Sequence, residues 1–150
     1  MNSKLLAFRP PRIAQFFVAV AVLLHLATPL RFELFANNVL GILLIAIGFS
    51  AMMAGWWLFR KQRTAICPTG TPSSLVVAGI YAFTRSPMYL GIFLMLLGLA
   101  VVVGSLPFYI AAIAYFAVMD TVFCPYEEEK LLQLFGDEFL CYEKRVRRWL

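Results

Sequence analysis

Four runs of apolar residues, each long enough to cross a bilayer, are the feature that most limits how this chain can fold. They cover residues 13–30, 39–59, 88–104 and 106–124. A membrane-spanning helix needs about 17–25 such residues, and backbone surrounded by lipid must satisfy its polar groups within a helix or a closed barrel. We therefore predict an all-α integral membrane bundle of about four transmembrane helices, with residues 1–150 forming a single domain and residues 125–150 a cytoplasmic helical tail.

Composition excludes the other broad classes of protein. The chain is 62% hydrophobic and 14% charged, whereas soluble domains average roughly half and a quarter. Its polar residues are too few to cover a soluble core, and its hydrophobicity excludes intrinsic disorder. The 3 cysteines form no CxxC pair and the chain has 1 histidine, so we expect no metal site and no disulfide framework.

Nearly all the positive charge lies in segments that four successive membrane crossings would place on the same side of the membrane. Of the 13 Lys and Arg residues, only Arg31 lies between the first and second runs. The others precede the first run, separate the second from the third, or follow the fourth. Cytoplasmic segments carry this excess, so we expect both termini to be cytoplasmic, in a bacterial inner membrane. Anionic lipid headgroups then balance the net charge of +5, and no nucleic-acid partner is expected.

The first run has a basic start, as a cleaved signal peptide would. However, its apolar stretch is longer than a usual signal h-region, and it lacks a clear A-x-A cleavage site. We therefore interpret residues 13–30 as a retained membrane anchor.

Two further stretches do not span the membrane. Residues 64–86 form a connection longer than most loops, and such loops are usually functional or disordered. After Cys124, apolar residues recur at steps of three or four and predict an amphipathic helical tail: Leu131, Phe135, Phe139, Tyr142, Val146 and Trp149. Gly136 is expected to end a first tail helix and Asp137 to cap a second. The tail should lie on the membrane surface or fold back over the spans.

The first candidate site precedes the third span. Ser86 and Pro87 have the residue types of a helix N-cap and first helical position. A helix N-terminus attracts anions, and the neighbouring Arg85 adds a planar donor fork that fits a carboxylate or phosphate. Gly91, one turn into the helix, leaves space on its surface. The alternative interpretation is a capped helix with an interfacial arginine and an aromatic anchor.

The second candidate site follows the fourth span, where Glu127, Glu128 and Glu129 are adjacent. They form either a solvated acidic first turn or a carboxylate site for a cationic or polyhydroxyl ligand. The third and fourth spans form an antiparallel hairpin, so the topology allows Arg85 to meet Glu127 and Glu128 on the cytoplasmic side. An anion clamp that faces two carboxylates suits a zwitterion with hydroxyl groups.

Two ionisable residues lie inside the predicted spans, where such groups are costly and often functional. Asp120 is a candidate for a chemical role, with pairing to Arg85 or to a backbone group as the alternative. His25 has no evident partner in the sequence, and we expect it to make a hydrogen bond within the packed helices. The pair Ala51 and Gly55 has the small-x-x-x-small spacing that permits close helix packing.

Residues 64–150 resemble isoprenylcysteine carboxyl methyltransferase-like and phospholipid N-methyltransferase-like proteins. Residues 79–91 resemble their G-P-Y-R-x-x-R-[HN]-P-x-Y-L-G motif, and residues 127–148 resemble their ending E-E-x-x-L-x-x-x-F-G-x-E-[YF]-x-x-Y-x-x-x-V-x-R. The chain departs from the first motif at three positions. It has Ile80 in place of Pro, Ala82 in place of Arg, and Ser86 where many members have His or Asn.

The resemblance implies an integral membrane methyltransferase that uses S-adenosylmethionine and binds it near the cytoplasmic membrane face. The implied acceptor is lipid-like or apolar, with an isoprenylcysteine-type carboxylate, a phospholipid amine or a thiol as the nucleophile. The implied cofactor-binding residues are Tyr81, Arg85, Ser86, Pro87, Tyr89, Leu90, Gly91, Glu127 and Glu128.

Roles for these residues follow from the parts of the cofactor. Arg85 and the helix start would hold the carboxylate of S-adenosylmethionine, while Glu127 and Glu128 would hold its ammonium or ribose. Tyr81 and Tyr89 would wall the adenosyl group or offer the sulfonium a π face. Arg85 and Glu128 are the candidate catalytic residues.

Two other functions remain open at this point. Membrane-embedded sterol reductases have a related hairpin and use NADPH, but they usually show an H-P-N-Y-x-G-E element, and here Ile92 follows Gly91. The second alternative is a non-catalytic membrane accessory protein that keeps the family shape. It stays open because Ser86 replaces the usual His or Asn of the motif.

Overall fold

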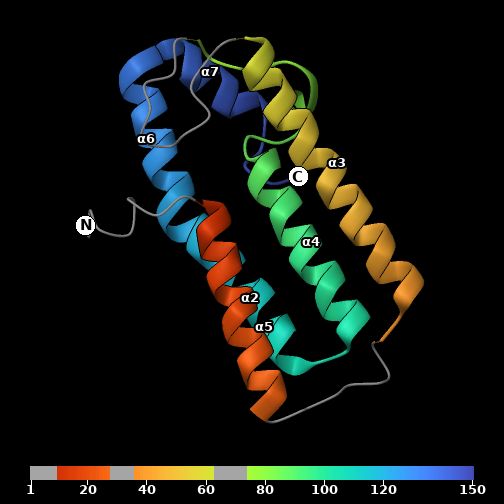
Figure 1. Ribbon diagram of the computed structural model, residues 1–150. Helices are drawn as coiled ribbons and strands as arrows, with labels where there is room; N and C mark the ends of the chain where they lie inside the picture. Colours follow the sequence, from red (N-terminus) through yellow and green to blue (C-terminus); the bar gives the residue numbers. More distant parts are fainter. Residues whose placement is uncertain (1–9, 28–35, 63–73) are drawn as a thin grey trace.

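The computed structural model describes residues 10–27, 36–62 and 74–150. Four helices form the body of the molecule (Figure 1): α2 (Pro10–Ala27), α3 (Asn38–Lys61), α4 (Pro87–Val103) and α5 (Leu106–Val118). They occur where the four apolar runs predict spans. The end of the first predicted run, residues 28–30, lies outside the described residues, as do residues 64–73 of the connection and the basic residues Lys4, Arg9, Arg31 and Arg63.

Three helical stretches of the described residues are long and apolar enough to cross a membrane. They are Pro10–Ala27, Asn38–Lys61 and Leu106–Phe135. The remaining helix, α4, is apolar but has 17 residues, which corresponds to about 26 Å against a hydrocarbon core of about 30 Å. It packs between α3 and α5, so neighbouring helices cover much of its length. The predicted all-α membrane bundle is confirmed.

The fourth predicted span continues into the tail without a break. A π-helical turn, η3 (Met119–Phe123), joins α5 to α6 (Cys124–Phe135), and together they form one element of 30 residues. The structure differs here from the expectation of a separate tail that begins at residue 125. Proline inside a helix crowds the carbonyl group four residues earlier, and the π-helical turn directly before Pro125 loosens the backbone at that point.

Glycines bring α3 and α4 into direct backbone contact. Gly48 lies opposite Gly91, and Gly41 lies opposite Gly98. A Cβ atom placed on Gly48 would stand 2.5 Å from the carbonyl oxygen of Gly91, and one placed on Gly98 would stand 2.6 Å from that of Gly41. Small residues permit this approach between membrane helices. The predicted pair Ala51 and Gly55 identified only one end of this interface, because its glycines recur every seven residues.

His25 makes the hydrogen bond within the packed helices that its sequence position predicts. Its Nδ1 atom lies 2.8 Å from the hydroxyl oxygen of Ser105, which is buried in the turn between α4 and α5. Its ring also packs edge-on against Phe108. This end of the bundle is opposite the end where α6 and the following helix turn back (Figure 1).

The C-terminal residues fold back over one end of the bundle, which is one of the two arrangements that the sequence allows. Gly136 ends α6 with φ of +49°, a left-handed value that favours glycine, and α7 (Asp137–Arg145) begins directly after it. Asp137 is thus the first residue of α7 and not its cap. Phe139, Tyr142 and Val146 form a small core with Leu131 and Phe135, as the periodicity predicts. Trp149, however, packs against Phe116 of α5.

Candidate active site

A short segment before α4 carries the first predicted motif. Gly79 has φ of +63° and begins a 3₁₀ turn, η2 (Gly79–Ala82). The hydroxyl group of Tyr142 on α7 donates a 2.6 Å hydrogen bond to the carbonyl oxygen of Tyr81, which ties this turn to the C-terminal region. Ser86 occupies the N-cap position and Pro87 the first turn of α4, as predicted. The side chain of Ser86 makes no capping bond, however, and instead its hydroxyl oxygen lies 3.4 Å from the sulfur of Cys124.

The second predicted motif faces this segment across a cavity of about 670 Å³. Its polar wall includes Arg85, Tyr89, Glu127 and Glu128. Its apolar wall is formed mainly by side chains of α3 and α4: Met52, Met53, Trp56, Phe59, Met88 and Ile92. Ligand pockets typically have volumes of roughly 300–1,000 Å³. The two sequence motifs therefore meet at one ligand-sized cavity, as the antiparallel hairpin predicts.

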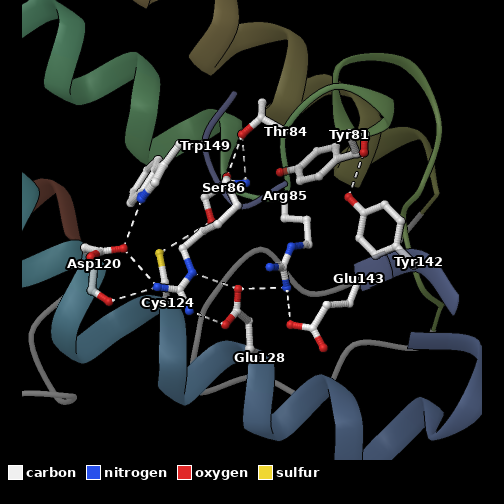
Figure 2. Close-up of polar contacts among 11 residues, drawn as sticks. Tyr81, Thr84, Arg85, Ser86, Asp120, Cys124, Glu128, Tyr142, Glu143 and Trp149 are labelled. Carbon is white, nitrogen blue, oxygen red and sulfur yellow. Dashed lines mark hydrogen bonds and ion pairs between the residues drawn. The ribbon is translucent and has the colours of Figure 1, made fainter. Parts of the chain in front are cut away.

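Figure 2 shows a chain of ion pairs beside this cavity. Glu128 lies at its centre, with Oε1 2.9 Å from Nη1 of Arg85 and also 2.9 Å from Nε of Arg148. Glu143 of α7 pairs with Nη1 of Arg85 at 2.8 Å, and Asp120 pairs with Nη1 of Arg148 at 2.9 Å. Three carboxylates thus share two guanidinium groups. Hydrogen bonds to charged groups are stronger than neutral ones, and this chain of ion pairs links α6, α7 and the segment before α4.

Residues 147–149 pack beside the ion pairs and hydrogen-bond to the segment before α4 and to Asp120. The backbone N–H of Arg85 donates to the carbonyl oxygen of Arg147 at 3.0 Å, and the Thr84 hydroxyl donates to that of Arg148 at 2.8 Å. The indole N–H of Trp149 donates to Asp120 at 2.9 Å. Asp120 therefore pairs with Arg148 and Trp149, and the predicted alternative of a pair with Arg85 does not occur.

Glu127 is separate from the ion-pair network. Its Oε1 atom accepts a short hydrogen bond from the hydroxyl group of Tyr89, and its side chain lines the cavity. The oxygens of Glu128 are by contrast occupied by two arginines. Of the two predicted carboxylates, Glu127 thus has the greater capacity to accept hydrogen bonds from a ligand.

Six of the nine predicted cofactor-binding residues line the cavity: Tyr81, Arg85, Ser86, Tyr89, Glu127 and Glu128. Pro87, Leu90 and Gly91 do not. Gly91 faces Gly48 of α3, so the space that it leaves on the surface of α4 is filled by the backbone of α3. Among the described residues, no group of three or more His, Cys, Asp or Glu side chains is placed to hold a metal ion.

Sequence reasoning missed several residues at this site. Arg148, Glu143 and Cys124 received no role, although Arg148 matches the V-x-R end of the second motif. That match was the one available signal, because the distance of 20 residues between Glu128 and Arg148 gives no indication of a contact. The nearby Lys130, also missed, lines the cavity.

Burial and hydrogen bonds keep two phenols and one guanidinium group at this end in fixed protonation states. Burial raises the pKa of Tyr142 to about 12 and moves the pKa of Tyr81 well above its ordinary value. Hydrogen bonds to Glu128 raise the pKa of Arg148. At neutral pH both phenols therefore remain hydrogen-bond donors and Arg148 remains a cation.

The Tyr142 hydroxyl offers a first test of how the C-terminal region is held. We expect Tyr142→Phe to lower the free energy of unfolding by about 1 kcal/mol, since the carbonyl group of Tyr81 loses its hydrogen bond. Thermal unfolding in detergent measures this change, and Tyr126→Phe on α6 is the matched control. Equal stability of Tyr142→Phe and the unaltered protein would contradict the expectation.

A family model described as phospholipid methyltransferase matches residues 36–138. The chain belongs to the phospholipid methyltransferase family. No curated protein and no solved structure gives a match.

Membership of the phospholipid methyltransferase family confirms the resemblance found in the sequence. Together with the apolar helices it makes this chain an integral membrane protein of an enzyme family that transfers methyl groups. The matched range contains both sides of the cavity, including Arg85, Glu127 and Glu128. It ends before Glu143 and Arg148, so their place beside the cavity rests on their contacts in the structure.

Proposed function

We propose that this chain transfers a methyl group from S-adenosylmethionine to a lipid-like acceptor, such as the amine of a phospholipid. The transfer takes place at the cytoplasmic face of a bacterial inner membrane, in a single domain with both termini cytoplasmic. The observation that carries the proposal is the cavity with carboxylates and tyrosines on one wall and apolar helix side chains on the other. The family match supports the same reaction class.

The groups that line the cavity fit the chemical parts of S-adenosylmethionine. The cofactor carries a carboxylate, an ammonium, two ribose hydroxyls and a sulfonium. Arg85 supplies a cation, and its Nε–H is buried without a hydrogen-bond partner among the described residues. Glu127 supplies a carboxyl group that accepts a hydrogen bond from the Tyr89 hydroxyl. Buried polar groups are usually bonded, so an unpartnered guanidinium N–H beside a cavity favours an anionic ligand there.

Each side chain then has a definite task. Arg85 holds the carboxylate, and Glu127 holds the ammonium or a ribose hydroxyl. Glu128, with both oxygens bonded to arginines, keeps Arg85 in place. The rings of Tyr81 and Tyr89 wall the adenosyl group or lie against the sulfonium. When bound, S-adenosylmethionine supplies a methyl group that its sulfonium already activates, so the protein mainly aligns the acceptor and excludes water.

The apolar wall accounts for a lipid-like acceptor. The methionine side chains of α3 and α4 that face the cavity are flexible and accommodate varied apolar groups. An amine acceptor must also lose a proton during methylation. Glu127 lies in the cavity wall and can accept it, whereas Asp120 does not line the cavity and is held by Arg148 and Trp149.

Ligand titration tests the proposal. We expect the detergent-purified protein to bind S-adenosylmethionine and S-adenosylhomocysteine in a calorimeter, and not to bind NADPH. Binding of NADPH alone would support the reductase alternative and overturn the proposal. Transfer of a labelled methyl group to a membrane lipid extract separates an enzyme from an accessory protein that binds the cofactor without turnover.

A further inference from the structure

Arg85 is shared between two carboxylates of the protein itself. Its Nη1 atom lies 2.9 Å from Oε1 of Glu128 and 2.8 Å from Oε1 of Glu143 (Figure 2). The Arg85 side chain is 12% exposed and lines the cavity. Among the described residues the Nε–H of Arg85 is free to bind a ligand carboxylate, but a ligand carboxylate that also binds Nη1 must displace one of these two partners.

The two partners are held very differently. Glu128 also receives hydrogen bonds from Nε and Nη2 of Arg148, and its side chain is 17% exposed. Glu143 is 39% exposed, and its pair with Arg85 is its one ion pair among the described residues. A partly exposed single pair is worth much less than a carboxylate held by two arginines. Glu143 is thus the partner that gives way.

The helix that carries Glu143 is held in place without the ion pair to Arg85. α7 has 9 residues and joins α6 through Gly136, around which no other atom lies within 4 Å of a hypothetical Cβ. Its anchor on the cavity side is the small core of Phe139, Tyr142 and Val146. Glu143 can therefore leave Arg85 by a change of its own rotamer, while α7 remains packed.

We propose that Glu143 competes with the carboxylate of S-adenosylmethionine for Arg85 and so lowers the affinity of the site. This inference rests on the proposed function, since it requires that the cofactor bind at this cavity. Glu143 acts as a specificity-setting residue that touches Arg85 and not the reacting atoms. It selects for ligands whose own carboxylate is a better partner for Arg85 than Glu143 is.

Competition for Arg85 and long-range electrostatic attraction predict opposite changes in affinity when Glu143 is replaced. S-adenosylmethionine carries a net positive charge, so removal of an acidic residue near its site should weaken binding through long-range attraction. Competition for Arg85 predicts instead that removal of the Glu143 charge strengthens the binding of S-adenosylmethionine. We expect Glu143→Gln to bind S-adenosylmethionine about three- to fivefold more tightly, in line with the modest strength of a partly exposed ion pair.

Calorimetric titration of three proteins and two ligands tests the proposal. The proteins are the unaltered chain, Glu143→Gln, and Glu138→Gln as an exposed control on the same helix. The ligands are S-adenosylmethionine and its decarboxylated form, which lacks the group that Arg85 would bind. We expect Glu143→Gln to gain affinity for the first ligand only, and Glu138→Gln to match the unaltered chain for both.

Two further comparisons make the result decisive. In the background of Arg85→Ala, the gain from Glu143→Gln should disappear, because the competed group is gone. Equal affinity of the unaltered chain and Glu143→Gln for S-adenosylmethionine overturns the competition while leaving the proposed function intact. A gain that also appears with the decarboxylated ligand overturns it as well. If no protein in the set binds S-adenosylmethionine, the proposed function fails, and the competition fails with it.

Discussion

Replacement of Glu128 by Gln is expected to weaken the binding of S-adenosylmethionine at least tenfold, or by about 1.4 kcal/mol. The Glu128 carboxylate forms an ion pair with Arg85 and accepts two hydrogen bonds from Arg148. A glutamine amide keeps one acceptor oxygen, but its NH₂ group would face a guanidinium donor. Arg85 would then lose its fixed position at the cavity, and the carboxylate of the ligand would lose a preorganised partner. Calorimetry of the detergent-purified variant measures the loss.

Glu129→Gln is the matched control for this change. Glu129 is the next residue along α6 and is exposed, so the same change in charge occurs one residue away from the network. We expect its affinity for S-adenosylmethionine to equal that of the unaltered protein. Thermal unfolding of both variants separates a loss of binding from a loss of structure. If folded Glu128→Gln binds as tightly as Glu129→Gln, the assignment of Glu128 to the site is wrong.

The second large effect is expected at the interface between α3 and α4. A methyl group added by Gly48→Ala would stand 2.5 Å from the carbonyl oxygen of Gly91 and 2.9 Å from the backbone nitrogen of Met95. Backbone atoms cannot move aside as a flexible side chain can, so the two helices must separate along their length. Overpacking costs about 1–3 kcal/mol, and we expect the variant to unfold at a clearly lower temperature in detergent.

Ala54→Val serves as the control for Gly48→Ala. Ala54 is an exposed residue of the same helix, and valine adds two carbon atoms where the test variant adds one. We expect the larger addition at Ala54 to change the unfolding temperature less than the smaller one at Gly48. Equal stability of Gly48→Ala and the unaltered protein would show that α3 and α4 do not pack through their glycines.

The two predictions are connected through α4. Its first turn carries Ser86 and Tyr89 at the cavity, and its Gly91 face is set against Gly48. A helix displaced at Gly91 would carry Tyr89 with it and move the partner of Glu127. We therefore expect Gly48→Ala to reduce ligand affinity as well as stability, even though Gly48 does not line the cavity.

Much of the fold follows from local sequence patterns. The apolar runs predicted all four helices of the bundle, because the length of a membrane helix is set by the thickness of the bilayer. Pro87 and Gly136 correctly marked a helix start and a helix end, since ring geometry and a left-handed φ act within one or two residues. The continuation of α5 through a π-helical turn was not predictable in this way, because Pro125 usually indicates a break.

At the candidate site, too, the sequence indicated some features and not others. Residue types and motif spacing indicated Arg85, Glu127 and Glu128 as residues that act together, and the antiparallel hairpin explains why they meet. The ion pairs that Arg85 and Glu128 form, however, depend on segments far apart in the chain. Arg148 reaches Glu128 across 20 residues, and Glu143 reaches Arg85 across 58. No local propensity encodes such contacts, since many acidic residues have the right chemistry to pair with an arginine.

By itself the sequence determined the membrane class of this protein, the order of its helices and the residue types at the cavity. These properties depend on hydrophobicity and on backbone preferences that act over a few residues. The tertiary structure alone decided which carboxylate each arginine holds, which predicted residues face the cavity and which face another helix. The reason is geometric, because an ion pair or a glycine contact requires two surfaces to meet at ångström distances, and only the packed bundle sets those distances.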